Sequence, residues 1–89
     1  MMKIIKIGAM WCPGCLVMKK IWNSINSRYD LDIVELDYDM NHDKVMEYNV
    51  GDVLPVVIFM NNDNIELDRL VGEQKEENIT MLIDKYMEE

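Results

Sequence analysis

The sequence predicts an α/β fold whose elements follow the order β-α-β-α-β-β-α. Three observations predict it. Short runs rich in isoleucine and valine alternate with segments whose apolar residues recur at helical spacing. The stretch "NNDN" (61–64), typical of a tight turn, separates two such runs, and a segment with a regular apolar stripe follows them. The first half therefore predicts a right-handed crossover between parallel strands, and the second half predicts an antiparallel hairpin with a covering helix.

The first predicted strand is "KIIKIG" (3–8), which is apolar on both faces apart from its lysines, as in a strand that is covered on both sides. A helix is predicted from about Pro13 to Arg28, because apolar residues recur along it at helical spacing while lysine and asparagine face outward. The apolar positions of this helix are Val17, Met18, Ile21, Trp22 and Ile25. Trp22 is therefore expected to pack in the core.

The middle of the chain holds a second strand and a short helix. The strand is "DIVELDY" (32–38), and the helix lies within "NHDKVMEYN" (41–49), with Asn41 as its expected N-cap. The only histidine, His42, lies at the polar start of this helix and is expected to be a solvated surface residue.

The last part of the chain predicts a hairpin and a helix. "VVIFM" (56–60) and "IELDRLV" (65–71) are the two strands, and Gly72 ends the second one. The final helix is expected from about Gln74 to Met87, because its apolar residues keep to one face. These residues are Ile79, Leu82, Ile83, Tyr86 and Met87.

Composition limits the kinds of protein that this chain can be. Its 89 residues suffice for one domain (1–89), and 49% hydrophobic with 29% charged residues is ordinary for a folded protein. The net charge of −8 argues against a nucleic-acid partner, which would need a basic surface. No apolar stretch approaches the roughly 18 residues of a membrane span, and "MMKIIKIGAMWC" lacks the pattern of a signal peptide. We expect a cytoplasmic monomer.

The only two cysteines, Cys12 and Cys15, are separated by Pro13 and Gly14. This spacing is compatible with a metal site, a structural disulfide or redox chemistry. A cytoplasmic location disfavours the structural disulfide. The pair holds only half of a four-ligand zinc site, and His42 is far away, so zinc would require two chains to share a site.

The predicted positions of the cysteines favour redox chemistry. Cys12 falls at the start of the first helix and Cys15 within its first turn, where the Cα separation of residues i and i+3 suits a disulfide. Pro13 suits the first helical position because it has no N–H. The unpaired N–H groups and partial positive charge of the helix N-terminus stabilise a thiolate. Cys12 is therefore expected to be the nucleophile, and Cys15, facing the core, the resolving thiol.

Beyond these two residues, the chain resembles the thioredoxin family. The resemblance rests on "WCPGC" (11–15), on "VLPVVIF" (53–59), which is similar to the loop with the family's cis-proline, and on "LVGEQKEENITMLIDKY" (70–86). It covers nearly the whole chain, except that the amino-terminal strand and helix of longer thioredoxins are missing. It implies a thioredoxin-like four-stranded mixed sheet in the order 2-1-3-4, helices on both faces and a cis Leu54–Pro55 bond.

The resemblance also implies an activity: reduction of protein disulfides by the Cys12–Cys15 couple, without a cofactor or metal, after which a thioredoxin-reductase-type donor restores the dithiol. Pro13 and Gly14 would support the couple. An extended substrate would lie on an apolar surface beside Cys12. That expected surface comprises Met10, Trp11, Pro13, Leu54, Pro55, Val71 and Gly72.

Departures from the family pattern leave two alternatives open. The Pro13-Gly14 order is reversed relative to thioredoxins and is similar to that of glutaredoxins, which use glutathione. Glutaredoxins, however, typically place a basic residue before the first cysteine, and residues 8–11 contain none. Their Gly-Gly-acid sequence is also replaced here, by Val71-Gly72-Glu73. The other alternative is a thioredoxin-like binding module without turnover.

A further departure concerns two charges. Thioredoxins bury an aspartate six residues before the first cysteine, pair it with a lysine on the neighbouring strand and use the acid in proton transfer. This chain has Lys6 at the first position and Glu35 at the second. Because a lysine in an apolar strand needs a partner, we expect Lys6 to pair with Glu35. Glu35 would then accept the proton of Cys15.

Overall fold

The computed structural model describes residues 2–87 and confirms the predicted order of elements. These are β1 (Lys3–Gly8), α1 (Pro13–Arg28), β2 (Asp32–Asp37), α2 (His42–Met46), β3 (Val56–Met60), β4 (Glu66–Val71) and α3 (Glu76–Met87). The sheet has the order β2-β1-β3-β4. β1 runs parallel to β2 and antiparallel to β3, and β3 pairs antiparallel with β4. The mixed thioredoxin-like sheet is therefore confirmed.

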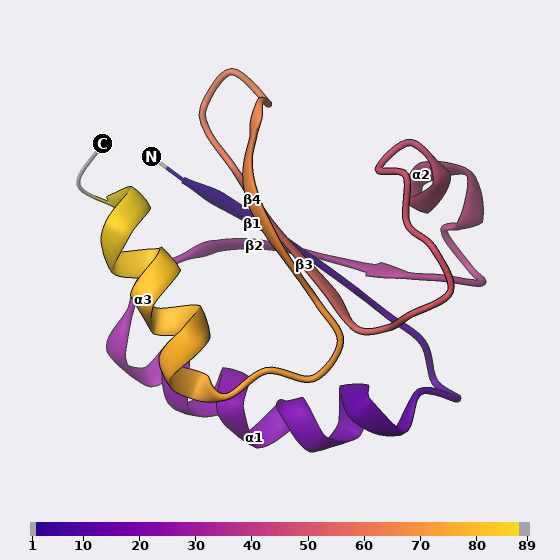
Figure 1. The fold of residues 1–89 in the computed structure, drawn as a ribbon, viewed down its shortest axis with the longest axis horizontal. Helices are drawn as coiled ribbons and strands as arrows, with labels where there is room; N and C mark the ends of the chain where they lie inside the picture. Colours follow the sequence, from indigo (N-terminus) through magenta and orange to yellow (C-terminus); the bar gives the residue numbers. More distant parts are fainter. Residues whose placement is uncertain (1, 88–89) are drawn as a thin grey trace.

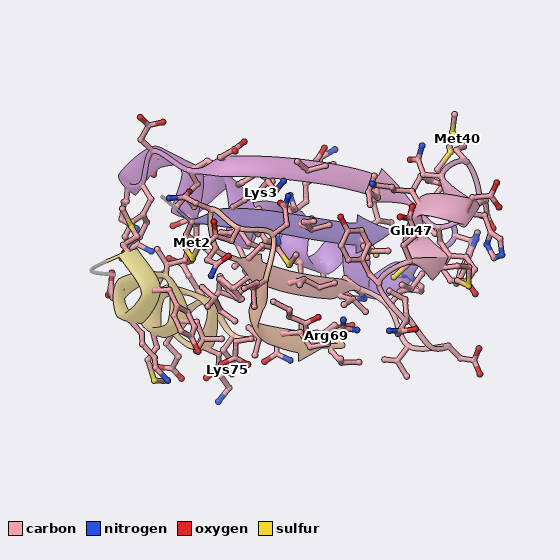
Figure 2. The ribbon with its side chains drawn as sticks, turned by 90° about the horizontal axis from the view of Figure 1, so that it is seen from above. Met2, Lys3, Met40, Glu47, Arg69 and Lys75 are labelled. Carbon is pink, nitrogen blue, oxygen red and sulfur yellow. The ribbon has the colours of Figure 1, made fainter. Side chains whose placement is uncertain are left out.

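Helices cover both faces of the sheet, α1 and α3 on one and α2 on the other (Figure 1). Seen from above, Met40 and Glu47 lie at the α2 end of the sheet and Met2 at the end beside α3 (Figure 2). The buried residues on the α1 face are Met2, Ile4, Met18, Trp22, Ile25, Val57, Phe59, Ile79 and Ile83. Those on the α2 face are Ile5, Ile7, Val45, Val50, Val56, Ile58 and Met60. β1 supplies buried side chains to both sets, as its two apolar faces predict.

Five details differ from expectation. β2 ends one residue earlier and β4 begins one residue later than predicted. Val17 is 57% exposed and does not share the buried face of α1. Asn41 is the N-cap residue of α2, as predicted, but its side chain makes no capping bond there and instead accepts a hydrogen bond from the N–H of Asp37. α3 begins at Glu76, because Gln74 folds back and its side-chain amide donates to the carbonyl of Val71.

Candidate active site

The two cysteines lie where β1 ends and α1 begins. The N–H of Cys12 donates to the carbonyl of Ala9 (3.2 Å), which closes the turn after β1. Cys12 has extended backbone angles and is the N-cap residue, and Pro13 is the first helical residue, as predicted. The sulfur of Cys12 accepts a hydrogen bond from the N–H of Cys15 (3.2 Å). A helix N-terminus thus donates directly to this sulfur, which is favourable for a negative charge on it.

The two thiols differ in their surroundings. Cys12 is only 4% exposed and Cys15 is half-buried, so Cys15 is the more accessible residue, although it was the one expected to face the core. Burial, followed by the hydrogen bond with Cys12, raises the pKa of the Cys15 thiol to about 11. Cys15 is therefore a thiol at neutral pH. Cys12 is the sulfur to which the N–H of Cys15 donates at the N-terminus of α1.

This raised pKa predicts a steep pH dependence for the reactivity of Cys15. In a Cys12→Ser variant, alkylation of Cys15 should still accelerate by up to about tenfold for each pH unit between pH 7 and 9. Only the thiolate reacts, and burial, the largest cause of the raised pKa, does not depend on Cys12. Stopped alkylation followed by mass spectrometry measures this rate. A rate that levels off by pH 8 would show that Cys15 ionises far more easily than its surroundings imply.

Gly8, which the sequence did not single out, sets the place of the resolving sulfur. A Cβ atom added to Gly8 would lie 2.9 Å from Cys15 Sγ, closer than such atoms approach in proteins. The last residue of β1 must therefore be glycine for Cys15 to lie against the strand. Only the packing of α1 onto β1 reveals this contact.

Asp39 is a second residue of the site that the sequence analysis did not identify. The indole N–H of Trp11 donates to Asp39 Oδ2 (2.6 Å), and the Trp11 ring lies edge-on to Tyr38 with 6.1 Å between ring centroids. Asp39 is itself held because Asp37 Oδ1 accepts hydrogen bonds from the N–H groups of Asp39 and Met40 (2.9 Å each). The loop after β2 thereby orients the tryptophan next to Cys12.

The residues expected to bind substrate differ in exposure. Met10 is 89%, Trp11 57% and Val71 51% exposed. Pro13 is exposed as well, whereas Leu54 is half-buried and Pro55 is buried. Val53, which was not predicted, adds a further exposed apolar side chain. Most of the residues expected to bind substrate therefore present exposed apolar side chains, whereas Pro55 does not.

The Leu54–Pro55 bond is cis, as predicted. The carbonyl of Pro55 accepts a hydrogen bond from the N–H of Gly72 (2.8 Å), which ties this loop to the end of β4. Within residues 2–87, the N–H and carbonyl of Leu54 make no hydrogen bond. These two backbone groups are therefore available to a strand that approaches from outside.

A cavity of about 450 Å³ lies beside Cys15, between α1 and the strands β1 and β2. Lys6 and Glu35 both line it, and they are neighbours in the register of β1 and β2. Lys6 Nζ lies 2.9 Å from Glu35 Oε1 and 4.6 Å from the centroid of the Trp22 ring. The hydrogen bond and charge of Lys6 lower the pKa of Glu35. The expected ion pair is therefore present, although the Glu35 side chain is 74% exposed.

Two thiols at a helix N-terminus, together with backbone groups that are free to pair with a substrate strand, are typical of proteins that catalyse dithiol–disulfide exchange. The family model described as Thioredoxin matches residues 2–85. The chain belongs to the thioredoxin family.

Individual relatives agree with this assignment. A thioredoxin of Staphylococcus epidermidis is 29% identical over 87 residues, which are 96% of this chain and 82% of that protein. A thioredoxin of Staphylococcus aureus is 26% identical over the same shares. Among solved structures, a thioredoxin from Nicotiana alata superposes with a TM-score of 0.86 at 27% identity, covering 96% of this chain and 72% of that one.

The protein is a thiol–disulfide oxidoreductase that acts on protein disulfides, because fold, motif spacing and relatives agree. Over the described residues, no helix combines the length and the apolar character that crossing a membrane requires.

Proposed function

We propose that this protein is a disulfide reductase in which Cys12 attacks the substrate and Cys15 resolves the resulting mixed disulfide. The Cys12 thiolate attacks one sulfur of a substrate disulfide, and the other substrate sulfur leaves as a thiolate. Cys15 then loses its proton and attacks Cys12 Sγ. The second substrate sulfur leaves, and the protein keeps a Cys12–Cys15 disulfide. Two electrons have passed from the protein to the substrate.

The observation that carries this assignment is the hydrogen bond from the N–H of Cys15 to Cys12 Sγ. It stabilises negative charge on Cys12, whereas burial and the hydrogen bond with Cys12 raise the pKa of Cys15 to about 11. The first attack therefore belongs to Cys12, although it is the less exposed residue. The second attack is intramolecular, and this proximity compensates for the small thiolate fraction of Cys15.

Substrate docking would use the free backbone groups of Leu54. An extended segment can pair with them as an added strand, and its apolar side chains can lie on Trp11 and Val71. Asp39 supports this surface, since it holds the Trp11 ring in place. Pro13, Pro55 and Gly72 shape the surface through the backbone. Gly14 leaves room at the first turn of α1.

The Lys6–Glu35 pair would assist the second attack through the cavity. Lys6 places a positive charge in the same cavity as Cys15, which favours the thiolate, and Glu35 would accept the proton. The low pKa of Glu35 makes it a weak base, so its share of the rate is modest. Because Glu35 is largely exposed, loss of the pair should lower the free energy of unfolding by no more than about 1 kcal/mol.

Glu35→Gln should slow resolution of a mixed disulfide by roughly threefold to tenfold, which is less than the loss of a general base usually costs. The rate of the initial attack by Cys12 should stay nearly unchanged. Rapid-quench kinetics of a preformed mixed disulfide measure the step. Glu47→Gln is a matched control, because Glu47 is exposed and pairs with Lys44 in α2. Equal resolution rates for Glu35→Gln and the wild type across neutral pH would remove Glu35 from the mechanism.

The electron donor completes the proposal. A thioredoxin-reductase-type flavoprotein would restore the dithiol. The protein would act in the cytoplasm, where thiols are kept reduced. It would be a monomer with one domain (1–89). The experiment is turnover of a protein disulfide with either NADPH and a bacterial thioredoxin reductase or glutathione as reductant. We expect turnover with the reductase. Turnover with glutathione alone would indicate a glutaredoxin-type activity, and no turnover with either would indicate a binding module.

A further inference from the structure

Glu73 lies over the first turn of α1. A Cβ atom added to Gly14 would be 2.9 Å from Glu73 Cγ and 3.1 Å from Glu73 Oε1. The same atom would be 3.2 Å from Pro55 Cδ. Only a glycine at position 14 therefore lets the carboxylate of residue 73 come this close to the motif. The Pro13-Gly14 order and the acid at position 73 fit together as one arrangement.

The backbone holds Glu73 in this place. The preceding residue, Gly72, has a φ of +86°, a conformation that favours glycine, and its N–H donates to the carbonyl of Pro55. Glu73 follows the end of β4 at this turn, and it lies near the loop that contains Leu54 and Pro55. Its side chain is exposed and makes no ion pair within residues 2–87. The charge is therefore both next to the dithiol and accessible to a ligand.

The charge of the loops that surround the dithiol has one sign. The segments that build the site are residues 8–15, 37–41, 50–56 and 71–74. They contain Asp37, Asp39, Asp52 and Glu73 but no lysine or arginine. Lys75 follows directly but lines a separate hollow with Arg28 and Thr80. The cations nearest the dithiol, Lys6 and Lys19, line the cavity beside Cys15, where Lys6 pairs with Glu35. A substrate segment that approaches over the Leu54 loop therefore meets negative charge first.

We propose that Glu73 is a specificity-determining residue that selects protein disulfides with lysine or arginine beside the reacting cysteine. This inference rests on the proposed function. A strand that pairs with Leu54 passes between Trp11 and the turn at Gly72, so a side chain next to its cysteine comes close to the Glu73 carboxylate. A cation there is attracted and an acid is repelled, both in the approach and in the mixed disulfide with Cys12.

The test uses three disulfide-bonded peptides that differ only in one residue beside the reacting cysteine: lysine, glutamine or glutamate. The value of kcat/KM for the lysine peptide should exceed that for the glutamate peptide by about threefold to tenfold at low salt. In Glu73→Gln this ratio should fall by at least half, and in Glu73→Lys it should approach one or invert. Since the ratio is taken within each variant, the amount of active protein cancels.

Glu77→Gln is the matched control, since Glu77 lies in the first turn of α3 and lines the separate hollow. It should keep the wild-type ratio. Raising the salt to about 0.5 M should lower the wild-type ratio, because exposed charges are screened. A wild-type ratio of one, or equal ratios in wild type and Glu73→Gln, would overturn the inference while leaving the reductase activity standing. Failure of the wild type to reduce even the glutamine peptide would instead refute the proposed function, and this inference with it.

Discussion

Cys12→Ser should abolish the reduction of protein disulfides, and Cys15→Ser should accumulate a covalent complex with the substrate. The first variant lacks the sulfur that accepts a hydrogen bond from the N–H of Cys15 at the N-terminus of α1. The second can still attack but cannot release the substrate, since nothing replaces the second thiolate. Intact-mass spectrometry after mixing with a disulfide-bonded protein should show the added mass in Cys15→Ser and no added mass in Cys12→Ser.

The double variant Cys12→Ser, Cys15→Ser is the control for non-specific adducts. Peptide mapping should place the cross-link on Cys12. A cross-link formed through Cys15 in the Cys12→Ser variant, at a rate comparable to that of Cys15→Ser, would reverse the two roles. The rates in the two variants are compared because Cys15 is the more exposed of the two residues.

Gly8→Ala should slow resolution by roughly tenfold to a hundredfold while leaving the attack by Cys12 largely intact. The new methyl group would lie 2.9 Å from Cys15 Sγ and 3.6 Å from Cys15 Cβ, so the sulfur must turn or move away from the strand. Displacement of a reacting atom by about 1 Å can cost a hundredfold in rate. Rapid-quench kinetics with a preformed mixed disulfide on Cys12 separate this step from the first attack.

Gly51→Ala is a matched control for Gly8→Ala, since a Cβ atom at Gly51 meets no atom within 4 Å. It should resolve mixed disulfides at the wild-type rate. If Gly8→Ala also resolved at that rate, the position of Cys15 against β1 would have no part in the second step. If both steps slowed equally, the methyl group would be disturbing the whole turn between β1 and α1.

The order of elements could be predicted because its signals are local. The "NNDN" turn shows this: Asn61 Oδ1 accepts hydrogen bonds from the N–H groups of Asp63 and Ile65, and Asn64 adopts a positive φ of 60°. Such bonds depend only on residues within the turn. Likewise, Pro13 marks the start of α1, and the apolar residues of β1 on both faces indicate a covered strand.

The site was only partly predictable, because several of its contacts join distant segments. Trp11 and Asp39 are 28 residues apart, and nothing in either local sequence indicates their hydrogen bond. The contact of Gly8 with Cys15 depends on how α1 packs on the sheet. Val17 fits the helical spacing of the apolar residues in α1, but its side chain lies outside the face of α1 that packs on the sheet. The Lys6–Glu35 pair was found because the resemblance supplied the register of β1 and β2.

The measurement that tests the central claim most directly is the reduction of insulin disulfides by dithiothreitol, followed as turbidity from the precipitating chain. The wild-type protein should shorten the lag and accelerate precipitation in proportion to its concentration, and the variant without both cysteines should not. Wild-type protein that leaves the dithiothreitol reaction unchanged would contradict the account, because a folded Cys12–Cys15 dithiol would then be present without catalysing disulfide exchange.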